Sequence, residues 1–170
     1  MGTNQRAQIV MSEAEIVDFI THSRTGTLAT IGADGHPHLT AMWYAVVDGE
    51  IWLETKAKSQ KAVNLRRDPR LSFLLEGGNT YDTLRGVSFE GVGEIVDDPD
   101  ALFRVGVSVW ERYTGPYTDE VKPMVDQMMN KRVGVRIISH RTRSWDHRKL
   151  GLPHLPVGGS TAPAALGTGQ

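Results

Sequence analysis

The stretch that decides the fold is residues 25–55, which read TGTLATIGADGHPHLTAMWYAVVDGEIWLET. Apolar and polar residues alternate along most of this stretch, as they do in β-strands that bury one face. Ala33-Asp34-Gly35 and Asp48-Gly49 are turn signals that divide it into three runs. The stretch therefore predicts a meander of three antiparallel strands.

Helices and further strands are predicted on both sides of this meander. Ser12 and Glu15 have the spacing of a capping box, so a first helix is expected from Ser12 to about Ser23. The other expected elements are, in chain order, a short helix that ends at Asp68-Pro69, a strand over 70–76, a long bent strand or two paired strands over 83–96, a helix that starts within 97–100, a helix over 118–130 and a strand over 132–140.

This element order predicts a mainly β fold with inserted helices. Six or seven strands in short turns favour a small antiparallel barrel, closed or split, because a parallel α/β sheet would need regular alternation of strands and helices. A chain of 170 residues has room for one such domain. We assign the domain to residues 12–153, between a flexible N-terminal lead, 1–11, and a flexible tail rich in Gly, Pro and Ala, 154–170.

Composition excludes several classes of function. The net charge of −1 and the lack of an aromatic-basic run argue against nucleic-acid binding. No segment approaches the ~20 apolar residues that span a bilayer, and no signal-peptide core is present, so we expect a cytoplasmic protein that does not contact membranes. Cysteine is absent, and His36 and His38 have no third ligand nearby, so no metal site is expected.

Positive charge is concentrated in residues 56–70, which read KAKSQKAVNLRRDPR. The stretch holds six of the nineteen basic residues and one acid, Asp68, so its charge is +5 while the whole chain carries −1. A compact basic island on a mildly acidic protein favours a small anion, such as a phosphate or a polycarboxylate, as its ligand. Structural roles are favoured for Arg66, Arg67 and Arg70, because Asp68 can pair with one of them.

A phosphate site is predicted where this basic stretch begins. Thr55 closes a strand, Lys56, Lys58 and Ser59 follow in a turn, and Lys61 lies in the first turn of the expected helix. Hydroxyl, ammonium and free backbone N–H groups would converge at that helix N-terminus, whose partial positive charge attracts anions. The alternative is a solvated basic helix that holds no ligand.

Two other segments carry groups suited to a ligand. Residues 40–44, TAMWY, place small and aromatic residues along one strand, where a planar heterocycle would find a flat surface; ordinary barrel packing is the alternative. Residues 141–149, RTRSWDHRK, combine Trp145 with acid-base and basic groups such as His147. The equal alternative for this second segment is a solvated edge that Trp145 anchors.

Four pieces of the chain carry a resemblance to a known family. GTLAT, DGHPHLT, NLRRDPR and SWDHRKLGLP, all within residues 12–153, resemble the pyridoxamine 5'-phosphate oxidase-like superfamily. The likeness is greatest to its actinobacterial flavin/deazaflavin oxidoreductase B branch, and the whole sequence is similar to a mycobacterial member. The resemblance implies a split β-barrel of the FMN-binding-protein type, which forms a homodimer with cofactor grooves at the subunit interface. It also implies a bound flavin cofactor, either the deazaflavin coenzyme F420 or FMN.

The resemblance assigns roles to individual residues. Thr55 and Lys61 match the family's phosphate-binding hydroxyl and lysine, whereas Lys58 and Ser59 lie in a loop one residue shorter than in some relatives. True pyridoxamine phosphate oxidases bind their substrate phosphate with an Arg-Leu-His motif, which is not evident in RTRSWDHRKL. This departure argues against oxidation of vitamin B6.

From the residues and the resemblance together we expect an F420H2-dependent reductase that gives a hydride to an organic substrate. Ala41 and Met42 match strand positions whose backbone faces the cofactor ring. Trp145 or His147 is expected to complete the site, and Lys56 or the arginines are expected to reach the acidic tail of F420. The candidate proton donors are Tyr44, His38 and His147. The alternatives are an FMN-dependent oxidase or reductase, and a carrier that binds F420 or another ligand without turnover.

Overall fold

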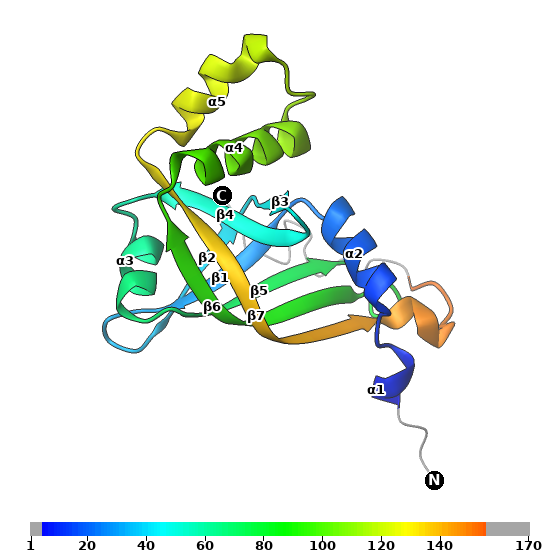
Figure 1. Cartoon of the computed structure of the whole chain (residues 1–170). Helices are drawn as coiled ribbons and strands as arrows, with labels where there is room; N and C mark the ends of the chain where they lie inside the picture. Colours follow the sequence, from blue (N-terminus) through cyan, green and yellow to red (C-terminus); the bar gives the residue numbers. More distant parts are fainter. Residues whose placement is uncertain (1–4, 156–170) are drawn as a thin grey trace, which may run out of the picture.

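Seven strands form one antiparallel sheet in the computed structural model, which describes residues 5–155 (Figure 1). The strands are β1 Gly26–Ile31, β2 Pro37–Met42, β3 Ala45–Val47, β4 Glu50–Lys56, β5 Arg70–Gly77, β6 Arg85–Val96 and β7 Arg132–Asp146. Their order in the sheet is β2-β1-β5-β6-β7-β4-β3, and the sheet curls into a half-barrel. The mainly β, antiparallel fold predicted from the sequence is confirmed.

The helices lie at the ends and edges of this sheet. They are α1 Gln5–Gln8, α2 Glu13–His22, α3 Gln60–Arg67, α4 Pro99–Tyr113 and α5 Lys122–Met129, with short 3-10 turns η1 Asp119–Val121 and η2 His147–Leu150. In Figure 1, α4 and α5 lie together over β3 and β4, while α2 lies beside the opposite end of the sheet. No helix within the described residues is long and apolar enough to cross a membrane.

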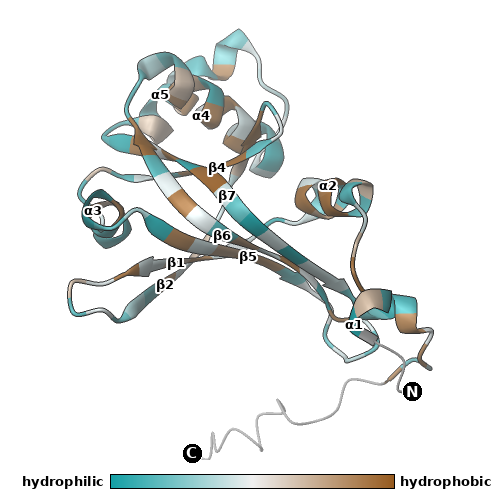
Figure 2. Ribbon diagram, turned by 60° about the horizontal axis from the view of Figure 1, so that its bottom comes forward, coloured by the Kyte–Doolittle hydropathy of each residue, from teal (hydrophilic) through white to brown (hydrophobic). Residues whose placement is uncertain are grey.

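The hydrophobic core has two parts. The larger part fills the inside of the curled sheet and includes Leu28, Phe73 and Leu75, each at most 1% exposed. The smaller part lies between the outer face of β4 and helices α4 and α5, where Trp52 packs near Val105. Brown and teal bands alternate along β6 and β7 in Figure 2, as expected for strands with one buried face.

The predicted meander is only partly correct. β1 and β2 form a hairpin, and β3 and β4 form another, around an Asp48-Gly49 turn in which both residues have positive φ. However, β2 and β3 lie at opposite edges of the sheet. The chain leaves the ladder at Tyr44, whose backbone N–H donates to the Tyr113 hydroxyl at 3.0 Å instead of to a neighbouring strand.

The final strand is longer than the sequence predicts. β7 continues to Asp146 and pairs with β6 along its whole second half, with a register shift at Glu90/Gly91. The strand end predicted at residue 140 is therefore wrong, although residues 141–146 pair only with β6 among the described strands and so do lie at an edge. The outward-facing side chains of this segment are polar because no other part of the described chain buries them, and this masks the strand pattern.

The segment before α2 differs from the flexible lead expected for residues 1–11. Residues 5–8 form α1, and Met11 is 5% exposed. The Met11 backbone N–H donates to Ser144 Oγ at 3.0 Å, and the Asp146 N–H donates to the Ile9 carbonyl at 2.7 Å. Residues 5–11 are thus docked against the end of β7; residues 1–4, and 156–170 of the expected tail, lie outside the described part of the chain.

Candidate functional site

The N-terminus of α3 is the place where the predicted phosphate ligands meet. Thr55 lies near the end of β4 and is 4% exposed, and its Oγ1 is 3.0 Å from Ser59 Oγ. Ser59 is the N-cap of α3, where its hydroxyl accepts from the Ala62 N–H at 3.4 Å. Because the first N–H groups of a helix lack intrahelical partners, this corner presents hydroxyl and amide donors together.

The three arginines of the basic stretch are used inside the fold. Arg66 donates to a backbone carbonyl in the turn before α3 at 2.6 Å, and Arg67 donates to one at the end of β1. Arg70 forms a two-pronged pair with Asp68, with Nη2 and Oδ2 2.6 Å apart, and these hydrogen bonds lower the pKa of Asp68 to about 2. The structural roles predicted for these arginines are confirmed.

The lysines of the same stretch divide into two kinds. Lys56 Nζ donates to the Asn130 carbonyl at 3.3 Å. Lys58 and Lys61 have no ion pair or hydrogen bond within residues 5–155; Lys58 is exposed and Lys61 is half-buried. Two ammonium groups near the α3 N-terminus therefore remain available to an anion. We call Thr55, Lys58, Ser59 and Lys61 the phosphate cradle.

Strand β2, which carries Ala41 and Met42, is an edge strand of the sheet. Among the described strands it pairs only with β1, so one side of its backbone has no strand partner for its N–H and C=O groups. Ala41 is exposed on the outer face, whereas Met42 packs against the larger core. An edge strand with a small exposed residue leaves room for a flat ring to approach its backbone, and the ring-facing role of Ala41 and Met42 stays a prediction.

Tyr44 is a structural residue in this chain. It is fully buried, and its hydroxyl donates to the carbonyl of Ile20, 2.6 Å away, with the Ser23 carbonyl at 2.9 Å. Burial raises the pKa of Tyr44 to about 12. The Tyr44 hydroxyl is buried and already hydrogen-bonded to carbonyls at the end of α2, so a ligand cannot reach it. Among the three candidates, Tyr44 therefore fits the role of proton donor least.

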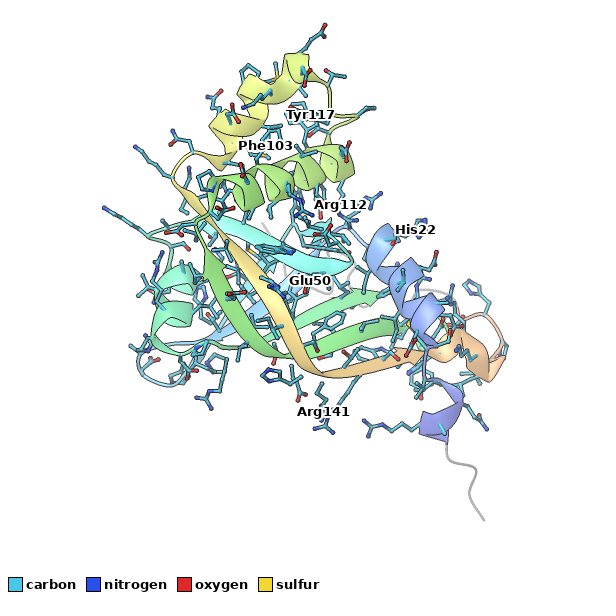
Figure 3. The ribbon with its side chains drawn as sticks, in the orientation of Figure 1. His22, Glu50, Phe103, Arg112, Tyr117 and Arg141 are labelled. Atoms are coloured by element: carbon cyan, nitrogen blue, oxygen red, sulfur yellow. The ribbon has the colours of Figure 1, made fainter. Side chains whose placement is uncertain are left out.

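Arg112 supports the same junction and was not singled out from the sequence. Its guanidinium lies 4.5 Å from the Tyr44 ring centroid and donates to the Ser23 carbonyl at 2.8 Å. Figure 3 shows Arg112 between α4 and the end of α2, where His22 lies. A basic residue in the last turn of α4 was visible in the sequence, but the partner helix is almost 90 residues away along the chain. No local pattern links the two.

Trp145 and His147 lie far from the phosphate cradle. On β7, Val133 pairs with Thr55 while Trp145 pairs with Gly86, and these twelve residues span about 40 Å along the strand at ~3.3 Å each. Figure 1 shows the two ends of β7 on opposite sides of the molecule. His147 Nδ1 is 2.9 Å from the Tyr81 carbonyl. One chain therefore does not bring Trp145 or His147 to the cradle.

His38, the remaining candidate, lies on β2 and faces the interior near α3. Its Nδ1 is buried and has no hydrogen-bond partner among residues 5–155. Within residues 5–155, no group of three or more potential metal ligands is found, so His36 and His38 do not form part of such a group.

The described residues form a curled, antiparallel sheet of seven strands with helices at its ends and edges, an arrangement consistent with a split β-barrel. A family model described as Pyridoxamine 5'-phosphate oxidase matches residues 12–146, and the chain belongs to this family. The comparison with curated proteins gave no match.

Three solved structures place the chain among its relatives. The conserved hypothetical protein Rv2991 of Mycobacterium tuberculosis is 86% identical, with a TM-score of 0.90 over 94% of this chain and 100% of that one. A structure titled F420 Reductase is 28% identical, with a TM-score of 0.56 over 74% of this chain and 93% of that one. HutZ of Vibrio cholerae, described as a heme storage protein, is 18% identical, with a TM-score of 0.62 over 79% of this chain and 96% of that one, and shows likeness of fold alone.

Proposed function

We propose that this protein binds the deazaflavin coenzyme F420 and acts as an F420H2-dependent reductase. The observation that carries the proposal is the phosphate cradle. Two hydroxyls 3.0 Å apart, a helix N-terminus and two lysines without a partner in the described part of the chain lie within a span of seven residues.

The cradle fits a phosphate group. Hydroxyls and helix N–H groups donate hydrogen bonds to phosphate oxygens. Lysine ammonium groups donate hydrogen bonds of their own, which are stronger because the donor is charged. Glu54, the acid next to Thr55 in the chain, is already paired with Arg132 and so does not oppose an anion there. The same groups would hold the phosphate of FMN, which makes an FMN-dependent oxidase or reductase the runner-up.

The preference for F420 rests on the comparisons more than on charge. The charge of +5 in residues 56–70 exceeds what one phosphate requires and so favours a ligand with an acidic tail. However, the guanidinium groups of Arg66, Arg67 and Arg70 already make contacts within the chain. The structure titled F420 Reductase shares 28% identity with this chain, which supports the deazaflavin. When bound, reduced F420 supplies a hydride, and the protein contributes binding, orientation and exclusion of water.

A homodimer would complete the site. Trp145 lies about 40 Å along β7 from the cradle of its own chain, and His147 follows the end of that strand, so a contribution of either residue to a cradle would require a second copy of the chain. The outer face of β2, β1, β5 and β6 suits such a contact, because Leu39 is 64% exposed there. Arg141 lies within β7, opposite Glu90 of β6, extends away from the sheet in Figure 3, and pairs with Glu90 at 4.0 Å.

Two separate binding titrations, one with F420 and one with FMN, test the proposed function. The protein is titrated at equilibrium with F420 and, separately, with FMN, and binding is followed by cofactor fluorescence. We expect F420 to bind at micromolar concentration or below and FMN to bind more weakly. Tight FMN binding without F420 binding would transfer the assignment to the FMN-dependent class.

Turnover separates the reductase from the carrier. Reduced F420 is mixed with the protein and a panel of enones, quinones and tetrapyrroles, and its reoxidation is followed by absorbance. Acceleration by at least one acceptor, lost in a cradle variant, is the result expected of a reductase. Binding of reduced F420 without reoxidation by any acceptor would favour the carrier.

A further inference from the structure

Trp43 is a large aromatic residue that the fold holds in place and leaves exposed. It follows the last residue of β2, and 56% of its surface is accessible to solvent. Its indole stacks on the ring of Tyr113, with the ring centroids 4.3 Å apart and the two planes 3° from parallel. Within residues 5–155, no second aromatic ring packs on Trp43. One face of the indole is therefore covered by Tyr113, and the other face is open to a ligand.

The ring beneath Trp43 is fixed by hydrogen bonds. The Tyr113 hydroxyl accepts from the Tyr44 backbone N–H at 3.0 Å and donates to the Arg24 carbonyl at 2.8 Å. Tyr44, the neighbour of Trp43 in the chain, is fully buried. Because both the backbone of Trp43 and the ring that supports it are anchored, a ligand that stacks on the indole has little side-chain ordering to impose.

An indole face of this kind favours a flat, electron-poor ring. The face of an aromatic ring carries partial negative charge, most strongly in tryptophan, so it attracts a ring whose own face is depleted of electrons. A saturated ring is puckered and contacts the indole over a smaller area. Carbonyl compounds that accept a hydride are electron-poor when they are conjugated, so stacking and reactivity favour the same class of compound.

Trp43 lies at the end of β2 that is farther from α3. His38, near the start of the strand, lines a pocket together with Gln60, the first residue of α3. Five residues separate His38 from Trp43, or about 16 Å at ~3.3 Å each. A ligand with its phosphate in the cradle and its ring along β2, as in the proposed function, therefore extends toward Trp43. An acceptor that meets this ring would have the open indole face beside it.

We infer that Trp43, supported by Tyr113, is the stacking surface for the hydride acceptor and selects planar conjugated carbonyl compounds over non-planar ones. The identity of the ligand as an acceptor rests on the proposed function, whereas the stacking itself does not need the cofactor. The proposed reduction moves a hydride and a proton from the reduced cofactor to the acceptor, so that a quinone becomes a hydroquinone. Trp43 determines specificity and takes no part in the transfer.

The test compares the binding of two probes by equilibrium dialysis, with and without saturating oxidised F420. The probes are menadione, which is planar, and the saturated decalindione with the same two-ring skeleton. The protein contains no cysteine thiol that could add to the quinone. Wild type is expected to bind menadione about tenfold more tightly than the decalindione, which corresponds to ~1.4 kcal/mol.

Three variants locate this preference. Trp43→Ala is expected to remove most of it, and Trp43→Phe, which keeps a flat ring, is expected to retain most of it. Tyr81→Ala is the matched control, because Tyr81 is 54% exposed and contacts another ring, that of His147, in a different part of the fold. The control should bind both probes as wild type does. Circular dichroism checks that each variant is folded.

The other outcomes overturn one claim or the other. Equal binding of both probes to wild type, or unchanged menadione affinity in Trp43→Ala, would overturn the inference and leave the proposed function standing. Weaker F420 binding by Trp43→Ala would place the indole against the cofactor, and a changed mass in light scattering would make it a contact between copies; either result overturns the inference. Failure of wild type to bind F420 would overturn the proposed function, while dialysis without cofactor would still decide whether Trp43 stacks on planar carbonyl compounds.

Discussion

Replacement of Lys61 by alanine perturbs the phosphate cradle with little effect on the rest of the fold. Lys61 is half-buried at the start of α3 and has no carboxylate partner within residues 5–155. Removal of the Lys61 ammonium group leaves no carboxylate without a partner, so the free energy of unfolding in the absence of ligand should change by no more than about 0.5 kcal/mol. A hydrogen bond from a charged donor is worth ~1.5–3 kcal/mol, which predicts a loss of F420 affinity of roughly tenfold to a hundredfold.

The assay is an equilibrium fluorescence titration of F420 against wild type, Lys61→Ala and one control. Lys122→Ala is the matched control, because Lys122 also opens a helix but pairs with Asp126 at 2.7 Å, outside the cradle. The control should bind F420 as wild type does. Unchanged affinity in Lys61→Ala, or an equal loss in Lys122→Ala, would refute the placement of the phosphate at α3.

Three further predictions concern the framework that positions the site. Tyr44→Phe removes the hydroxyl contacts to α2 and should lower the free energy of unfolding by about 1–2 kcal/mol in a denaturant titration while F420 binding persists; lost turnover at unchanged stability would instead indicate proton transfer. Gly106→Ala places a Cβ 2.8 Å from Met129 Cγ and should cost about 1–3 kcal/mol in the same titration; a variant as stable as wild type would show that α4 and α5 can separate freely. Arg70 lowers the pKa of Asp68 from 3.8 to about 2, so the stabilisation is present at neutral pH and lost as the pH falls through that interval; wild type and Asp68→Asn should converge there, and a constant difference would contradict the pairing.

Local signals in the sequence predicted the elements well. Ser12 and Glu15 form both hydrogen bonds of the capping box, and α4 begins after the N-cap Asp98. α3 ends at Arg67, with Asp68 as its C-cap, as expected before Pro69. Each of these features depends on residues within four positions of one another, so the chain itself supplies enough information.

The errors arose where distant segments decide the structure. β2 and β3 separate because Tyr44, which lies between them in the chain, hydrogen bonds to Tyr113 and to the end of α2. No sequence pattern near Tyr44 indicates either contact. Residues 5–11 dock because Met11 and Ile9 bond to the end of β7, more than 130 residues away. Spacing along the chain does not reveal partners of this kind.

The candidate site was predictable in part. Hydroxyls and lysines that follow a strand and open a helix indicated an anion site at Thr55, Ser59 and Lys61, and the structure brings the two hydroxyls together. The sequence did not show which basic residues would be occupied internally. It also gave no sign of the pocket between the β1–β2 hairpin and α3, which His38 and Asn64 help to line, because segments distant in the chain form that pocket.

A crystal structure of this protein soaked with F420 tests the central claim most directly. The account predicts phosphate oxygens within hydrogen-bond distance of the Thr55 and Ser59 hydroxyls and of Lys61, with the ring along β2. A phosphate bound at another basic surface, such as that around Arg141, with the α3 N-terminus empty, would contradict it.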